Sequence, residues 1–162
     1  MSTRKDEVLI PSGSVNKYSY FVASGSLATT MITESGESRA VWFHFDNKFR
    51  VALCPDSYFL DEPTQYEMRA LEDTRLIRFH KQNIDAWAAK YPAFNQLYFK
   101  DLANISTIIQ DLRSYKLSHT PLQFLTYINN KYPVFSQRLS SKHMAHFLGV
   151  SPEWYSKLKK KF

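Results

Sequence analysis

The stretch that decides the fold is the C-terminal end of the chain, SSKHMAHFLGVSPEWYSKLKKKF, which runs from Ser140 to Phe162. Its apolar residues are spaced for two short helices that cross closely, because Ala145 and Gly149 are small enough to lie at the crossing and at the turn. Tyr155 and Leu158 lie three positions apart, so both face inward from the second helix. This spacing predicts a helix-turn-helix.

The start of the second helix is expected at Ser151. Serine is a good N-cap, Pro152 suits the first helical position, and Glu153 complements the positive helix start. In helix-turn-helix proteins this first turn enters the major groove of DNA. The residues expected at bases are Pro152, Glu153, Ser156 and Lys157, with Ser151 as cap, and those expected at phosphates are Lys159, Lys160 and Lys161. The alternative is a pair of amphipathic helices with a basic tail.

Composition places the chain among folded proteins of one ordinary domain or two small ones. It has 162 residues, of which 44% are hydrophobic and 15% aromatic. Its single cysteine, Cys54, excludes an intramolecular disulfide and a Cys-rich zinc site, which fits a reducing compartment. The sequence lacks a long apolar run and the apolar core of a signal peptide. We therefore expect a cytoplasmic protein that has no membrane partner.

Charge is distributed unevenly along the chain. Residues 113–162 contain nine Lys and Arg residues and one acidic residue, whereas residues 1–112 contain 12 Lys and Arg residues and 14 acidic residues. A local excess of +8 fits an electrostatic footprint for nucleic acid, since phosphate neutralisation supplies most sequence-independent affinity. A membrane surface or an acidic partner would give a similar excess. The helix-turn-helix spacing favours double-stranded DNA.

The first 80 residues have the pattern of a strand-rich domain. Turn signals such as Pro11-Ser12-Gly13 and Glu34-Ser35-Gly36 separate short aromatic and β-branched runs. Several short strands at near-regular spacing suggest a barrel or sandwich. The strands expected are 7–10, 18–23, 26–33, 38–45, 49–53, 66–71 and 75–80.

From Asn83 the hydrophobic period becomes helical. Tyr91-Pro92 interrupts it, because a proline disfavours the α-region for the residue before it. A long helix is then expected from Ala93 to about Leu117, with an apolar stripe that needs a partner. The stripe packs on the chain's own β-domain or forms a two-fold dimer seam. The residues assigned to this dimer helix are Phe94, Leu97, Tyr98, Ile105, Ile108 and Leu112.

The segment Ser118-His119-Thr120-Pro121 is expected to be a hinge-like link, with Thr120 as N-cap of the next helix. That helix runs to about Lys131, and Tyr132-Pro133 ends it. The predicted domains are 1–82, 83–117 and 118–162. The face of this helix expected to be buried consists of Leu122, Phe124, Leu125 and Ile128.

The order of these parts and the sequences of several segments resemble those of the Crp/Fnr family of transcription regulators, especially the short members typical of Bacteroidetes. The resemblance covers nearly all of the chain. It implies an α+β fold: a cyclic nucleotide-binding-like β-roll (a double-stranded β-helix, jelly-roll-like), a homodimer through the long helix, and promoter binding through residues 151–161 beside RNA polymerase. The segments that carry it are Tyr20-Phe21-Val22 with Gly25, 70–74, Tyr91-Pro92-Ala93-Phe94, and 147–153 with Ser156-Lys157.

The sequence departs from the nucleotide-binding members of that family. Their phosphate cassette has a Gly-Glu pair and an Arg, whereas residues 49–69 contain no glycine and offer Thr64-Gln65 at the arginine position. We therefore expect no tight cAMP binding, since the bidentate guanidinium contact is missing. Arg50 and Arg69 flank this window and could bind another anion, but solvated or structural roles are favoured for them. We expect a β-roll that has lost its effector or changed it to an unknown small molecule.

Two further departures lie near the ends of the chain. Lys157 stands where the family's reading helix has an arginine, and it keeps the charge without the planar fork. The sequence stops without a wing hairpin and starts late compared with the family, which suggests a shortened start. The missing wing and Lys157 count in favour of a rival hypothesis, in which a degenerate β-roll acts as an interaction or small-ligand module without specific DNA binding.

No constellation of catalytic residues is evident, so we do not expect an enzyme. Gly-rich phosphate loops and GxSxG elbows are missing. His143 and His146 have a spacing that could hold a metal on one helical face, but a third ligand is lacking nearby. The sequence therefore predicts no catalytic site, no metal site and no evident cofactor.

Overall fold

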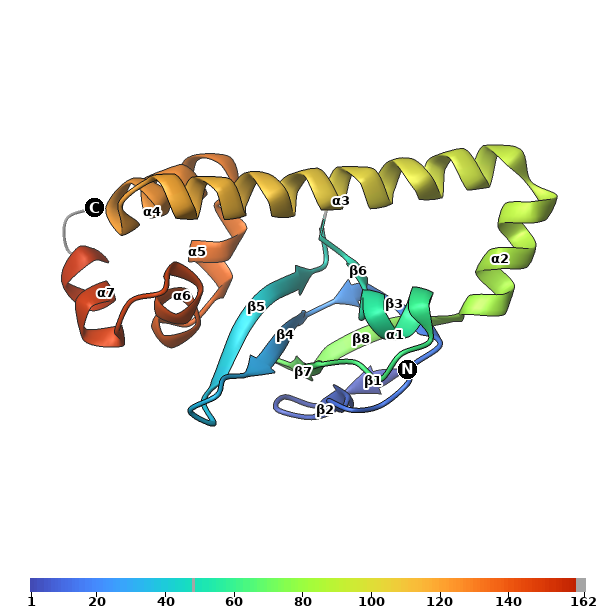
Figure 1. Cartoon of the computed structure of the whole chain (residues 1–162), viewed down its shortest axis with the longest axis horizontal. Helices are drawn as coiled ribbons and strands as arrows, with labels where there is room; N and C mark the ends of the chain where they lie inside the picture. Colours follow the sequence, from blue (N-terminus) through green and yellow to red (C-terminus); the bar gives the residue numbers. More distant parts are fainter. Residues whose placement is uncertain (48, 160–162) are drawn as a thin grey trace. The chain divides into compact units, whose positions relative to one another are not determined.

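The computed structural model describes residues 1–47 and 49–159, and it divides into two compact units, Met1–Asp101 and Leu102–Phe162. We call them the roll unit and the head unit. The long helix α3 (Pro92–Ser118) contributes its first part to the roll unit and the rest to the head unit (Figure 1). Each unit is described by itself below.

The roll unit is built from two four-stranded antiparallel sheets. One sheet has the order β1-β8-β3-β6 and the other β2-β7-β4-β5 (Figure 1). Sequential strands therefore alternate between the sheets except at the β4–β5 hairpin, as in a roll. The prediction of an α+β fold with a β-roll is confirmed. The strands are β1 (Ser2–Thr3), β2 (Val8–Ile10), β3 (Tyr18–Ser24), β4 (Ser26–Ile32), β5 (Ser38–Phe45), β6 (Val51–Ala52), β7 (Tyr66–Ala70) and β8 (Thr74–His80).

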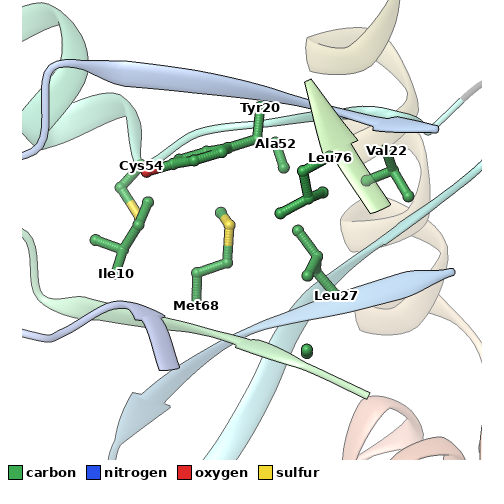
Figure 2. Packing of buried hydrophobic residues seen from close by; sticks show 9 residues of the cluster. Ile10, Tyr20, Val22, Leu27, Ala52, Cys54, Met68 and Leu76 are labelled. Atoms are coloured by element: carbon green, nitrogen blue, oxygen red, sulfur yellow. The ribbon is translucent and has the colours of Figure 1, made fainter. Parts of the chain in front are cut away.

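The core of the roll lies between the two sheets. Alternate residues of β3, Tyr20 and Val22, face Leu27 of β4 and Met68 of β7, and all four are at least 95% buried (Figure 2). The Tyr20 ring extends toward Cys54. Each large apolar side chain removed from water contributes roughly 1.5–3 kcal/mol. The side chains that β3 turns toward the other sheet therefore supply the packing that closes the roll.

Gly25 connects the sheets between β3 and β4. Its φ is +99°, and a Cβ atom at this position would lie 2.4 Å from the Thr74 hydroxyl oxygen. Any other residue at this position would be strained by the left-handed backbone conformation, and its Cβ would clash with Thr74. The Ser26 amide donates to the same hydroxyl at 3.2 Å, which fixes the corner.

Three elements of the roll differ from the predictions. The strand expected at 49–53 is only β6, because Asn47 accepts from the Phe49 amide and its carbonyl accepts from Arg50, which makes a turn there. Helix α1 (Pro55–Leu60) was not predicted. Strand β1 was also missed, since two residues paired to β8 show no periodicity.

Helices α2 (Lys81–Lys90) and α3 follow β8. Tyr91 has an extended backbone between them, which confirms the predicted break at Tyr91-Pro92. Aromatic rings continue across this break: Trp87 contacts Phe79 at 6.0 Å and Phe94 at 5.9 Å between ring centroids. The start of α3 is thus packed against its own roll.

The head unit contains α4 (Pro121–Lys131), α5 (Val134–Arg138), α6 (Ser141–Leu148) and α7 (Pro152–Lys159) besides the end of α3. Thr120 caps α4 as predicted, in a reciprocal pair of bonds with Gln123. The prediction for Leu122 was wrong, because its side chain is 38% exposed at the start of α4. The buried face of α4 is Phe124, Leu125 and Ile128.

Candidate nucleic-acid interface

Helices α6 and α7 form the crossing that the sequence predicted. Ala145 is fully buried, so the two helices approach closely. Gly149 ends α6 with φ +77° and ψ 31°, the left-handed conformation that favours glycine. The Val150 amide donates to the Ala145 carbonyl at 2.9 Å, which fixes the turn. Tyr155 and Leu158 of α7 are buried at 3% and 4% exposure, as expected.

The first turn of α7 faces solvent. The Ser151 hydroxyl accepts from the Trp154 amide at 3.1 Å, so the predicted N-cap is confirmed. Pro152, Glu153, Ser156 and Lys157 are all exposed, and the structure brings them together on this turn and the next. Lys159 is exposed at the end of α7. The predicted phosphate contacts Lys160 and Lys161 lie outside the described residues.

Several polar groups of this turn are used within the helix itself. Glu153 has a lowered pKa, because its carboxylate accepts from its own backbone amide and then from the Ser151 hydroxyl. The Ser156 hydroxyl donates to the Pro152 carbonyl at 2.9 Å. These bonds stabilise the helix start, and they occupy atoms that the sequence assigned to base contact.

A polar cluster that sequence reasoning missed joins α3 to α4. The Asp111 carboxylate accepts from the Lys131 ammonium at 2.7 Å and from the Tyr127 hydroxyl in a very short bond. These bonds lower the pKa of Asp111. The Tyr127 ring also stacks on Tyr115 at 4.0 Å. The spacing of Tyr127 and Lys131 along α4 was visible in the sequence, but their partner lies 16 and 20 positions earlier.

The predicted effector residues do not gather at one place. Arg50 donates to the Asn47 carbonyl at 2.6 Å and lies over the Phe21 ring, in the turn before β6. Arg69 forms an ion pair with Glu67 at 2.8 Å on β7, which belongs to the other sheet. Both guanidinium groups are thus engaged in local contacts.

Thr64 and Gln65 lie just before β7. The Thr64 hydroxyl is buried and accepts from the Tyr66 amide at 3.1 Å. Gln65 is exposed, and its amide donates to the Asp56 carboxylate at 3.1 Å. Asp56 also accepts from the Ser57 amide at 2.8 Å. The chain's own carboxylate therefore takes backbone amides that an anionic ligand of this window would need.

Two tyrosines, one on α1 and one near the start of α3, have buried hydroxyl oxygens. Neither the Tyr58 hydroxyl nor the Tyr98 hydroxyl has a hydrogen-bond partner of good geometry among the described residues. Burial, and then the neighbouring Tyr58, raises the pKa of Tyr98. Burial also raises the pKa of the Cys54 thiol to about 11, so this cysteine is a buried, neutral side chain, as expected.

The residues assigned to the dimer helix fall into two groups. Phe94 and Tyr98 stack on each other within the roll unit, and Leu112 is buried within the head unit. Leu97 is 59% exposed, while Ile105 and Ile108 are half-buried. Residues near both ends of the apolar stripe therefore pack on their own chain, Leu97 faces solvent, and the dimer seam stays a prediction.

Residues 1–47 and 49–159 contain neither a membrane-spanning helix nor a cluster of metal ligands. None of the helices there is long and apolar enough to cross a membrane. Over the same residues, no three His, Cys, Asp or Glu side chains are grouped so that they could hold a metal ion.

A family model named cyclic nucleotide-binding domain matches residues 1–91. This match covers more than half of the sequence, so the chain belongs to the cyclic nucleotide-binding domain family. No protein with a curated description matches the chain in sequence.

Solved structures extend the likeness to the whole chain. FixK2 from Bradyrhizobium japonicum superposes with a TM-score of 0.79 at 16% identity, covering 99% of this chain and 82% of FixK2. The c-di-GMP responsive global regulator CLP from Xanthomonas campestris gives 0.74 at 12% identity, with 99% and 84% covered. A protein of Eubacterium rectale, described as a regulator of the crp/fnr family, gives 0.70 at 13%, with 100% and 76% covered. The chain therefore has the fold of the Crp/Fnr regulators.

Proposed function

We propose that this chain is a homodimeric transcription regulator of the Crp/Fnr type that binds a specific DNA sequence through α7. The observation that carries the proposal is the exposed first turn of α7, held outward by the buried Tyr155 and Leu158. Family membership and the fold of the neighbouring structures support the coarser statement that it is a transcription regulator.

Charge supports DNA as the partner of the head unit. Residues 113–162 carry a formal +8, and Lys157 and Lys159 are exposed on α7. A positive helix-turn-helix gains affinity when it neutralises phosphates, and base contacts then supply specificity. RNA polymerase is a further partner in this proposal, as for other regulators that act at promoters.

The exposed middle of α3 supports a homodimer. Leu97 and Ile109 are 59% and 42% exposed, and the half-buried Ile105 lies between them along the helix. Apolar side chains at this spacing fit a seam between two copies of the helix. A two-fold dimer would place two α7 helices in successive major grooves.

The roll is proposed to respond to a signal other than tightly bound cAMP. Asp56 accepts from the amides of Ser57 and Gln65, while Arg50 is engaged in the turn before β6 and Arg69 pairs with Glu67 on β7. A cyclic phosphate bound in this window would be repelled by the Asp56 carboxylate, and the guanidinium groups of Arg50 and Arg69 are already used in local contacts. Tight binding of cAMP is therefore not expected. The effector is proposed to be a small molecule of another kind.

Selection of bound duplexes from a random DNA pool tests the proposal, at near-physiological salt with and without cAMP. The proposal predicts an enriched two-fold-symmetric site with half-sites about one helical turn apart, and the same enrichment without cAMP. Enrichment only with cAMP would contradict the effector part. A lack of enrichment in both arms would favour the rival function, a roll that docks a protein or binds a small ligand.

A further inference from the structure

The first turn of α7 offers fewer free polar groups than its sequence suggests. The Ser151 hydroxyl caps the helix, the Ser156 hydroxyl donates to Pro152, and Glu153 folds back onto Ser151 and its own amide. Pro152 has no amide hydrogen. Three exposed side chains of α7 have groups that the helix does not use: Trp154 and Lys157, near its start, and Lys159, at its end.

Trp154 is the large exposed side chain of α7. Its indole is 41% exposed, although it precedes the buried Tyr155 by one position, about 100° around the helix. Its backbone amide donates to the Ser151 hydroxyl at 3.1 Å, and within residues 1–47 and 49–159 its indole N–H has no hydrogen-bond partner. Within the described chain no aromatic ring stacks on the indole, so its free face is not part of the head core.

We propose that Trp154 is a specificity-determining residue that reads the 5-methyl group of a thymine in the major groove. The proposal rests on the proposed function, because it requires α7 to lie in that groove. Thymine is the base that presents an apolar group there, and apolar side chains recognise it by contact. An indole at the flank of the first turn can cover this methyl while Lys157, one turn later, donates to guanine acceptors.

The two side chains divide the reading between them. Lys157 provides a point charge without a planar fork, so it discriminates less sharply than an arginine would. The indole adds a large apolar surface with few rotatable bonds, which raises affinity at little entropic cost. Specificity of this head is therefore assigned to one apolar and one cationic contact for each half-site.

Uracil substitution isolates the methyl contact. Each thymine of the selected duplex is replaced singly by deoxyuridine, which removes one methyl and keeps the hydrogen-bond pattern. The unmodified protein is expected to lose about fourfold in affinity at one symmetric position of each half-site, the value for one buried methyl group. Trp154→Ala is expected to bind the thymine and uracil duplexes equally at that position, and Trp154→Phe to restore part of the difference.

A matched control removes an exposed apolar side chain elsewhere in the head. Leu122→Ala on α4, with Leu122 38% exposed, should leave the thymine-to-uracil difference unchanged. Thermal melting of each variant confirms that it is folded. If Trp154→Ala keeps the full difference, the proposal is wrong while specific DNA binding stands. If the unmodified protein shows no preference for any duplex, the proposed function itself fails.

Discussion

The ammonium group of Lys116, near the end of α3, donates a hydrogen bond of 2.8 Å to the backbone carbonyl of Phe147, near the end of α6. The last carbonyls of a helix lack partners within it, and a cation there also interacts favourably with the helix dipole. The Lys116 side chain would be 3.5 Å from a Cβ at Gly149. The long helix is thus bonded directly to the first helix of the reading pair.

Replacing this ammonium should loosen the head. Lys116→Met keeps the unbranched apolar stem of the side chain but removes the donor, so we expect the free energy of unfolding to fall by about 1 kcal/mol. Urea unfolding followed by circular dichroism measures the change. Lys100→Met, at an exposed position of the same helix, is the control and should change stability by less than about 0.5 kcal/mol. Equal effects of the two variants would show that the bond to Phe147 contributes nothing.

A buried histidine should make the roll sensitive to acid. His44 donates from Nδ1 to the Val51 carbonyl at 2.9 Å, and its Nε2 lies 3.1 Å from the Thr29 hydroxyl. Burial lowers the pKa of His44 from 6.5 to about 4. Between these values the unfolded chain binds a proton that the folded chain does not, so stability falls as pH decreases from 6.5 toward 4.

We expect this histidine to contribute a loss on the order of 2 kcal/mol over that range. His44→Gln retains a donor for Val51 but does not titrate, so the variant should lose that part of the pH dependence. Urea unfolding of both proteins between pH 7 and pH 4.5 measures the difference. Parallel pH profiles for the two proteins would contradict the assignment.

Removing a buried hydroxyl of the roll should stabilise the protein, in contrast to the losses of stability predicted above. The hydroxyl of Tyr58 is buried without a well-formed hydrogen bond among the described residues. Removing such a group while keeping the ring is neutral or stabilising, so Tyr58→Phe should raise the free energy of unfolding by up to about 1 kcal/mol. Thermal and urea unfolding check this. If Tyr58→Phe instead lowers the free energy of unfolding by more than about 1 kcal/mol, the two hydroxyls form a hydrogen bond with each other. Tyr98→Phe should then cause a similar loss.

The proposed dimer seam is tested by placing a charge at the half-buried Ile105 in the middle of α3. Ile105→Glu places a carboxylate in the proposed seam, where burying it would cost several kcal/mol, so we expect a monomer in sedimentation velocity. Thr107→Glu, at an exposed position of the same helix, is the control and should remain a dimer. A monomeric unmodified protein at micromolar concentration would contradict the dimer, and a dimeric Ile105→Glu would place the seam elsewhere.

Local patterns predicted the parts of this fold that local chemistry determines. Ser151-Pro152 and Thr120-Pro121 start helices because cap and proline act within one turn, and Tyr91-Pro92 breaks a helix for the same reason. Helix α5 was missed because five residues after Pro133 show too little periodicity, although Phe135 and Leu139 are both buried.

Features that depend on distant partners could not be predicted. Strand β1 exists through its pairing with β8, and the Asp111 carboxylate meets Lys131 only after α3 and α4 pack. Within the candidate interface, the sequence identified which residues are exposed but not that Ser156 and Glu153 bond within their own helix. It also passed over Trp154, because exposure of an aromatic residue next to a buried one depends on the crossing of α6 and α7.

Equilibrium binding to two duplexes tests sequence-specific DNA recognition most directly. The protein is titrated with its selected duplex and with a scrambled duplex of the same length, at near-physiological salt. We predict that the selected duplex binds at least about 10³-fold more tightly. Lys157→Ala should reduce this ratio at least tenfold, an effect of about 1.4 kcal/mol, whereas Lys159→Ala should weaken both duplexes equally. Equal affinity of the unmodified protein for both duplexes would contradict the proposed function.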